Sequence, residues 1–202
     1  NQQKKTAILT LDIKKAFDCV SHEILNKLLK KTGFYGLALG VLMDYFKNRS
    51  QKVIINGTAS DIEDVTSGCA QGSNLGPLIF LIYINDFLRL KLKGKARLFA
   101  DDAAITYSTT DIPTLYEYMQ IDLCVIESFL ASINLELSTE KTKFMIFACN
   151  NNSNNFPASI SFNNKSIEKV ESFRYLGVIF DQNLNWKLHA KHVISKLTSY
   201  VR

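Results

Sequence analysis

Three aspartates stand in apolar surroundings, where a charged side chain needs a specific partner. Asp12 interrupts the apolar run of residues 8–13, and Asp101 and Asp102 are adjacent within the apolar run of residues 98–105. Two like charges side by side repel each other, and a cation shared between them relieves the repulsion. For the adjacent pair the alternative is ordinary turn chemistry, because Asp favours turns. For Asp12 the alternative is an ion pair with Lys or Arg.

Carboxylates of this kind suit a divalent cation, with Mg²⁺ as the first expectation and Mn²⁺ as an alternative. Mg²⁺ is held by one or two carboxylates together with substrate phosphates, so Asp12 and Asp101 would be a sufficient protein contribution. Two such ions, roughly 3.5 to 4 Å apart, would hold the attacking and leaving oxygens of a phosphoryl transfer. The pattern therefore predicts a metal-dependent site that acts on phosphates.

The spacing of apolar residues predicts the elements that would position these carboxylates. Leu9, Leu11 and Ile13 fall on one face of a strand with period two, which leaves Asp12 on the opposite face. Residues 98–105 predict a short β-hairpin with buried ends and with both carboxylates at its tip. The two elements together would bring the three aspartates close to one another.

A glycine-rich segment at residues 67–77 leads into an apolar helix expected over residues 77–90. Its glycines allow close approach of a bound partner, and a helix N-terminus favours an anion. The spacing matches neither of the common glycine-rich nucleotide motifs, and an ordinary loop and cap is the alternative. The alternating charges of residues 89–97 are typical of a solvated sheet edge, or of a surface that contacts phosphates.

Composition describes a globular chain with a mild preference for anionic partners. Hydrophobic residues make up 47% of the 202 residues, and the formal net charge is +5. The longest apolar run is too short to cross a bilayer, so we expect no membrane partner. The four cysteines are widely spaced, which favours free thiols in a reducing compartment. The chain lacks an initiating Met and reaches strand-like sequence within ten residues, so we expect a segment of a longer protein.

Periodicity and turn residues predict the remaining elements. The expected helices cover residues 21–31, 37–47, 113–132 and 186–201, and Ser21 is the expected N-cap of the first. The expected strands cover residues 51–55, 62–66, 135–137, 143–147, 159–162, 165–170 and 174–180, and residues 150–155 form a surface loop. The first two strands are expected to form a hairpin through the turn Asn56-Gly57. The core stripe expected on residues 113–132 comprises Leu115, Tyr118, Met119, Leu123, Ile126 and Leu130.

The order of these motifs closely resembles the reverse transcriptases of non-LTR (LINE-type) retrotransposons. The resemblance begins at Leu11-Asp12-Ile13 and Phe17-Asp18 and continues through Gln71-Gly72-Ser73, Gly76-Pro77 and Phe99-Ala100-Asp101-Asp102. It ends with Lys141-Thr142 and Arg174-Tyr175-Leu176-Gly177-Val178. Each motif is weak alone, whereas five in order at plausible spacing are specific and cover most of the chain.

The resemblance implies a role for each matched residue. Asp12, Asp101 and Asp102 would be catalytic and metal-binding, with the carbonyl of Ile13 as an auxiliary metal ligand. The nucleotide-binding residues would be Phe17, Gln71, Gly72 and Lys141, and the primer-binding residues would be Tyr175, Leu176 and Gly177. Phe17 would discriminate against the ribose 2′-hydroxyl, and Lys141 would lie near the leaving pyrophosphate. An ordinary core position for Phe17 and a surface position for Lys141 are the alternatives.

The resemblance also implies an α+β fold, namely a polymerase palm with an antiparallel sheet backed by helices. The palm would cover residues 1–184, with a partial fingers segment at about 34–66, and residues 185–202 would begin the thumb. The implied activity is RNA-directed DNA polymerisation, with an RNA template, a DNA primer and a dNTP as partners. The implied location is intracellular, in the nucleus. Without complete fingers and thumb, we expect the chain alone to be inactive.

Two positions depart from the family pattern. Ala70 stands where relatives often carry Pro, and Phe99 stands where Tyr is commoner. Both residues keep the size or the aromatic character of the usual residue, so we expect them to adjust the activity rather than abolish it. A group II intron or retron-type enzyme is the nearest enzymatic alternative, and a decayed copy that only binds nucleic acid is the alternative of another class.

Overall fold

The computed structural model describes residues 4–70, 72–147 and 157–200. The chain divides into two compact units, which are described separately. The sheet unit comprises Asn1–Ile13, Leu90–Ser128 and Leu137–Arg202, and the helical unit comprises Lys14–Arg89 and Phe129–Glu136. No helix in the described part of the chain is long and apolar enough to span a membrane.

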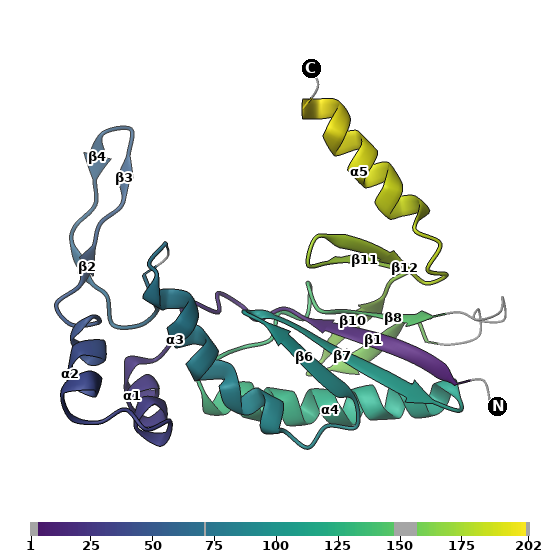
Figure 1. Ribbon diagram of the computed structural model, residues 1–202, viewed down its shortest axis with the longest axis horizontal. Coiled ribbons are helices and arrows are strands. Elements are labelled where there is room, and N and C mark those ends of the chain that lie inside the picture. The colour runs from purple at the N-terminus through teal and green to yellow at the C-terminus, as the bar shows by residue number, and fades with distance from the viewer. Residues whose placement is uncertain (1–3, 71, 148–156, 201–202) are drawn as a thin grey trace. The chain divides into compact units, whose positions relative to one another are not determined.

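Figure 1 shows the helices and strands. The α-helices of the described residues are α1 (His22–Lys31), α2 (Gly36–Asp44), α3 (Leu75–Ile84), α4 (Ile112–Ser132) and α5 (Lys187–Tyr200), and a 3-10 turn, η1 (Asn85–Arg89), follows α3. The strands are β1 (Lys5–Leu11), β2 (Ser50–Gln51), β3 (Ile54–Ile55), β4 (Thr58–Ala59), β5 (Glu63–Asp64), β6 (Lys95–Phe99), β7 (Asp102–Thr109), β8 (Lys143–Phe147), β9 (Ser159–Phe162), β10 (Lys165–Lys169), β11 (Ser172–Tyr175) and β12 (Val178–Asp181).

A six-stranded sheet with the order β6-β7-β1-β8-β10-β9 forms the body of the sheet unit. β1 lies between β7 and β8 and pairs with both in antiparallel fashion. The predicted antiparallel sheet is correct except at one place, because β10 runs parallel to β8. The central position of β1 gives backbone partners on both sides to the strand that leads into Asp12.

One face of this sheet is the core face, and α4 runs along it (Figure 1). Leu9 and Leu11 are buried on that face, as the alternation predicts, and Phe144 of β8 contacts Tyr116 of α4 with ring centroids 5.6 Å apart. The predicted stripe on α4 is buried at Leu115, Met119, Leu123, Ile126 and Leu130. Tyr118 is only half-buried, so that one member of the stripe was predicted wrongly.

The hairpin of β6 and β7 has a two-residue turn, Ala100-Asp101, and pairs Phe99 with Asp102. Its ends are not both buried as predicted: Ala103 is 1% exposed, but Phe99 is 64% exposed. The difference arises because Phe99 pairs with Asp102 on the face opposite α4, whereas Ala103 pairs with Leu11 and lies on the core face. β6 is an edge strand of the sheet, so the alternating charges of residues 89–97 lie partly on a sheet edge, as one of the two interpretations predicted.

The C-terminal part of the sheet unit is a separate β-hairpin followed by α5. β11 pairs with β12, and Leu176-Gly177 forms the turn, with φ of 47° and 85°. A single strand over residues 174–180 was predicted wrongly, because the turn lies within that range. The buried carboxylate of Asp181 accepts hydrogen bonds from the N–H groups of Asn183, Asn185 and Trp186, and so organises the turn before α5.

The helical unit begins with α1, whose N-cap is Ser21 as predicted. The Oγ of Ser21 accepts a hydrogen bond from the N–H of Ile24 at 3.4 Å. α3 falls in the segment predicted as an apolar helix, residues 77–90, and it buries one side. Tyr83 is 1% exposed and donates to the carbonyl of Ile133 at 2.6 Å, whereas Leu78 is 54% exposed.

Two short ribbons extend the helical unit between α2 and α3. The turn Asn56-Gly57 joins β3 and β4, with φ of 49° and 81°, which fits a tight hairpin turn. The predicted partner segment, residues 62–66, pairs instead with the residues before β3: β5 pairs with β2. Residues 135–137 were predicted as a strand but form only an isolated bridge between Ile13 and Leu137.

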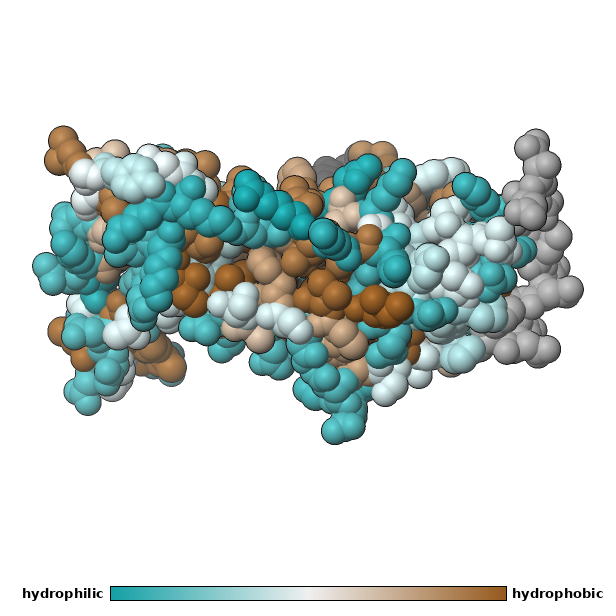
Figure 2. Space-filling model, turned by 90° about the horizontal axis from the view of Figure 1, so that it is seen from below, coloured by the Kyte–Doolittle hydropathy of each residue, from teal (hydrophilic) through white to brown (hydrophobic). Residues whose placement is uncertain are grey.

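Large apolar side chains remain exposed on the described part of the chain. Figure 2 shows brown apolar residues at the surface, beside teal hydrophilic ones, on the face seen from below. Leu37 on α2 is 86% exposed, and Ile55 and Ile62 beside the ribbons are 67% and 68% exposed. The predicted loop at residues 150–155 lies outside the described residues. The predicted division into palm, partial fingers and thumb stays a prediction.

Candidate active site

The sheet register brings Asp12 and Asp102 to one place. Leu11 at the end of β1 pairs with Ala103 near the start of β7, so the next pair in the same register is Asp12 with Asp102. Paired residues of neighbouring strands project from the same face of the sheet. Both aspartates line a cavity of about 120 Å³ on the face opposite α4. Its lining residues are Thr10, Leu11, Asp12, Asp102, Ala103, Lys141, Arg174 and Tyr175.

The backbone of Asp12 is held on both sides by the segment that precedes β8. The carbonyl of Asp12 accepts a hydrogen bond from the N–H of Ser138 at 2.8 Å. The N–H of Asp12 donates to Oγ1 of Thr142 at 3.3 Å, and Thr142 is fully buried. From the sequence, Thr142 was assigned no role beyond its place in the Lys141-Thr142 motif. A hydroxyl directly after the matched lysine was the signal that could have indicated a role in the site. The structure identifies Thr142 as a positioning residue for Asp12.

Two carboxylates, Asp12 and Asp102, and two cations, Lys141 and Arg174, line the cavity. The Nζ of Lys141 lies 3.7 Å from Oδ1 of Asp12, and the Lys141 side chain is largely exposed. Partial burial raises the pKa of Asp102, and the negative charges of Asp101 and Asp12 raise it further. The cavity therefore disfavours the ionised form of Asp102 unless a further cation is present.

Asp101 lies in the turn between β6 and β7 and is exposed, after Ala100 with φ of 54°. Asp101 does not line the cavity, although its charge acts on Asp102. Among the described residues, no group of three or more His, Cys, Asp or Glu side chains is arranged as a metal centre. The donor chemistry nevertheless fits a divalent cation, because Asp12 and Asp102 offer hard carboxylate oxygens to one cavity and the charges of Asp12 and Asp101 repel that of Asp102.

Ile13, predicted as an auxiliary ligand through its carbonyl, is buried directly after Asp12. In the bridge between Ile13 and Leu137, the N–H of Ser138 donates to the carbonyl of Asp12. The carbonyl of Ile13 takes no part in this bridge. The predicted ligand role stays a prediction.

The predicted primer-binding residues lie on the hairpin of β11 and β12. Tyr175 lines the cavity together with the carboxylates. Burial raises the pKa of Tyr175, and the charge of Asp102 raises it further. Leu176 and Gly177 form the exposed turn of that hairpin. Arg174 also lines the cavity, and sequence reasoning assigned it no role.

Two predicted nucleotide-binding residues, Phe17 and Gly72, belong to the helical unit. The half-buried ring of Phe17 lies 4.8 Å from the ring of Phe80, which agrees with the alternative of a core position. Gly72 is exposed with φ of 80°, a conformation that favours glycine. Gln71 lies outside the described residues. The nucleotide-binding roles of these three residues stay predictions.

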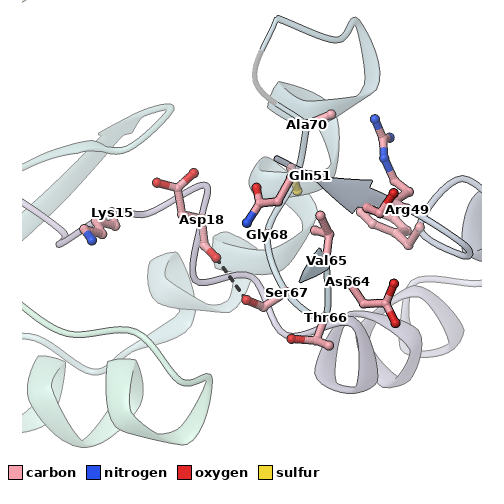
Figure 3. A pocket seen from close by; sticks show the side chains of 13 residues that line it. Lys15, Asp18, Arg49, Gln51, Asp64, Val65, Thr66, Ser67, Gly68 and Ala70 are labelled. Atoms are coloured by element: carbon pink, nitrogen blue, oxygen red, sulfur yellow. Dashed lines mark hydrogen bonds between the residues drawn. The ribbon is translucent and has the colours of Figure 1, made fainter. Parts of the chain in front are cut away.

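A larger cavity of about 610 Å³ lies within the helical unit, and Asp12, Asp101 and Asp102 do not line it (Figure 3). Lys15, Asp18 and Arg49 line it with Gly68 and other residues of the glycine-rich segment. Oγ of Ser67 donates to the carbonyl of Asp18 at 3.3 Å, which fastens that segment. A Cβ on Gly68 would lie 2.9 Å from the same carbonyl, so close backbone packing requires the glycine.

Solved structures of low sequence identity share the fold of this chain. The telomerase of Candida albicans in complex with a TWJ fragment of telomeric RNA has a TM-score of 0.58 and 16% identity, over 89% of this chain and 31% of that one. The apo telomerase of Candida tropicalis truncated from its C-terminal domain has a TM-score of 0.56 and 14% identity, over 90% of this chain and 35% of that one. The fold is therefore a polymerase palm, as predicted.

Residues 1–180 match the family described as reverse transcriptase (RNA-dependent DNA polymerase), and the chain belongs to that family. Its relatives include the probable RNA-directed DNA polymerase from transposon X-element of Drosophila melanogaster, 27% identical over 96% of this chain and 21% of the relative. The RNA-directed DNA polymerase from mobile element jockey of Drosophila melanogaster is 26% identical over 91% of this chain and 20% of the relative.

A third relative is the Pol polyprotein from the type-1 retrotransposable element R1 of Bradysia coprophila, 26% identical over the whole of this chain and 20% of the relative. The predicted resemblance to non-LTR retrotransposon enzymes is thereby confirmed. The chain spans about a fifth of the length of these relatives. The reverse transcriptase family generally uses divalent metal ions.

Proposed function

We propose that this chain carries out the polymerisation step of a non-LTR retrotransposon reverse transcriptase. The 3′-hydroxyl of a DNA primer gives its proton to solvent water and attacks the α-phosphate of a dNTP on an RNA template. A bond forms between O3′ and the α-phosphorus, and the bond to the pyrophosphate oxygen breaks. The observation that carries this proposal is the meeting of Asp12 and Asp102 in one cavity with Lys141 3.7 Å from Asp12.

In this proposal Asp12, Asp102 and the neighbouring Asp101 hold Mg²⁺. Carboxylate oxygens are ligands that Mg²⁺ accepts, and substrate phosphates complete its shell. When bound, the metal lowers the pKa of the primer hydroxyl and neutralises charge on the leaving group. Burial raises the pKa of Asp102 and repulsion from Asp101 and Asp12 raises it further; the repulsion supports the assignment, because a cation would relieve it.

The other residues of the cavity position the substrates. Thr142 and Ser138 hold the backbone of Asp12, so the end of β1 that carries the carboxylate is fixed before the reaction. Lys141 would contact a phosphate of the nucleotide, and its largely exposed side chain has the freedom to reach one from its place beside Asp12. Tyr175 beside Asp102 supports a primer contact on the same cavity. We further propose an intracellular, nuclear setting, which the free thiols of Cys19, Cys69 and Cys124 support.

Primer extension by the full-length protein tests the proposal, with an RNA template, a DNA primer, dNTPs and Mg²⁺. Asp12→Asn and Asp102→Asn should each lower the rate at least about 100-fold, because each removes a metal-binding charge. The matched control is Glu117→Gln on the exposed side of α4, which removes one carboxylate far from the cavity. Extension by both Asn variants at the rate of the control would overturn the proposal. A wild type that binds the duplex without extending it would instead identify a decayed copy.

A further inference from the structure

We propose that the edge strand β6 carries a phosphate-binding track, formed by Lys95 and Arg97, for the backbone of the primer–template duplex. The inference rests on the proposed function and adds a binding surface to it. The track lies within the sheet unit, like the carboxylates.

The sheet register puts the track on the same face as the carboxylates. Arg97 pairs with Ala104, and Ala104 pairs with Thr10. Directly paired residues project from the same face, and positions two apart along a strand share a face. Arg97 therefore lies on the face that carries Asp12, two residues after Thr10, and Asp102, two residues before Ala104. The same reasoning places Lys95, which pairs with Thr106, on this face.

That face of β6 is open to a ligand. Lys95 and Arg97 are exposed, and α4 covers the other face of the sheet (Figure 1). Neither residue forms an ion pair with any residue that the structure describes, whereas seven other Lys and Arg residues do. Arg97 donates only to the carbonyl of its neighbour Ala96, at 2.9 Å. Two uncompensated positive charges beside a phosphate-processing site fit a polyanionic backbone.

Charged residues on an edge strand also prevent edge-to-edge aggregation, which is the alternative role. Lys93, just before the strand, distinguishes the two. Its Nζ lies 5.7 Å from the centre of the Tyr118 ring on α4, so Lys93 serves the helix-covered side. Protection against aggregation would require charged side chains on either face of β6. A track for a duplex requires them on the open face.

The dimensions fit a contact close to the primer end. Residues on a strand are about 3.3 Å apart, so Arg97 and Lys95 lie about 7 and 13 Å from Phe99, which pairs with Asp102. A base-pair step of duplex is about 3.4 Å along its axis. For a duplex lying along β6, the contacts fall within about the first five base pairs behind the reacting end.

The test measures binding of an RNA–DNA duplex to the full-length protein at several salt concentrations. The double variant Lys95→Gln/Arg97→Gln keeps polar side chains on the edge strand but removes both charges. We expect affinity to fall about 10-fold or more at low salt for every duplex sequence, and the slope of log affinity against log salt to decrease by about 1 to 2. Lys95→Arg/Arg97→Lys should retain the wild-type slope.

The matched control is Lys93→Gln/Lys165→Gln, which also removes two positive charges. Lys93 faces Tyr118, and Lys165 lies at the start of β10, away from β6 in the strand order. An equal decrease of slope in the control and in the track variant would overturn the inference, since only net charge would then matter. An unchanged slope in the track variant would also overturn it. Primer extension by the wild type, measured in parallel, reports on the proposed function independently of the slopes.

Discussion

The N–H of Asp12 donates a hydrogen bond to Oγ1 of Thr142 across 130 residues of sequence, at 3.3 Å. Thr142 is fully buried, and its own N–H donates to the carbonyl of Ser138, whose N–H in turn holds Asp12. The loop before β8 and the end of β1 thus form one hydrogen-bonded unit behind the carboxylate.

This unit predicts the effect of Thr142→Val, which preserves shape but removes the acceptor. Substitution of a residue that orients a metal ligand typically lowers metal affinity or activity 10- to 100-fold. We therefore expect primer extension to fall by about that factor, with a higher Mg²⁺ concentration needed for half-maximal rate. Thr142→Ser, which keeps the hydroxyl, should remain within about 3-fold of wild type. Equal Mg²⁺ requirements in the Val and Ser variants would show that the hydrogen bond does not position Asp12.

Asp102→Asn should stabilise the metal-free protein while it impairs extension. The pKa of Asp102 is raised in the folded state, so the folded protein binds this proton more tightly than the unfolded chain. Ionised Asp102 therefore opposes folding, and the penalty is absent at low pH and grows as pH rises through the carboxylate range. We expect the Tm in EDTA at pH 7 to rise by a few degrees at most, because Asp102 is exposed and water screens its charge. A lower Tm would contradict the prediction.

Asp111→Asn is the control of opposite sign. Hydrogen bonds from the N–H and Oγ1 of Thr114 at 2.9 and 3.0 Å lower the pKa of Asp111 just before α4. Its stabilising contribution is present above the unfolded carboxylate pKa and is lost as pH falls through the folded one. The variant should therefore lower the Tm at pH 7 and have less effect near pH 3. Melting curves at both pH values measure the contrast with Asp102→Asn.

Phe17→Val tests the predicted sugar discrimination. If the ring excludes the ribose 2′-hydroxyl, the smaller side chain should raise ribonucleotide incorporation relative to deoxynucleotide by about 10-fold or more. Phe80→Leu is the matched control, because Phe80 supplies the other ring of the 4.8 Å contact and is fully buried. Both variants should lose stability, but only Phe17→Val should change the ratio. A ratio that stays at the wild-type value would return Phe17 to the core.

Gly94→Ala should destabilise the sheet unit. A Cβ at Gly94 would collide with Cγ2 of Ile105 and lie 2.7 Å from Cε1 of Tyr107, both of which belong to buried residues. Such overpacking costs about 1 to 3 kcal/mol. Gly40→Ala in the middle of α2 meets no atom within 4 Å and should stabilise the protein by about 0.5 to 1 kcal/mol. Chemical denaturation measures the change in unfolding free energy for both variants. A change of the same sign in both would contradict the packing argument.

Local chemistry along the chain was sufficient to predict many elements. Ser21 caps α1, Asn56-Gly57 turns a hairpin, and β8 and β9 have their expected bounds. The alternation of residues 8–13 predicted the buried face of β1 and the opposite position of Asp12. These features depend on neighbours within a few residues, which the sequence displays directly.

Where prediction failed, the deciding contacts lie between distant segments. The exposure of Phe99 follows from the sheet register, which pairs it with Asp102 on the face that α4 does not cover. The pairing of β5 with β2 follows from a ribbon that continues beyond the hairpin of β3 and β4. The parallel pairing of β8 and β10 is likewise set by strand order rather than by the residues of either strand. Strand propensity depends on such neighbours, so it could not distinguish these outcomes.

The candidate site divides in the same way. The sequence by itself determined the chemistry of this protein, namely three aspartates on strand and turn positions and the motifs of a reverse transcriptase. Only the tertiary structure decided that Asp102 rather than Asp101 lines the cavity with Asp12, that Thr142 holds Asp12, and that Arg174 and Tyr175 share the cavity. The physical reason is that residue types are local properties, whereas a cavity is made by register and strand order, which bring together side chains far apart in the chain.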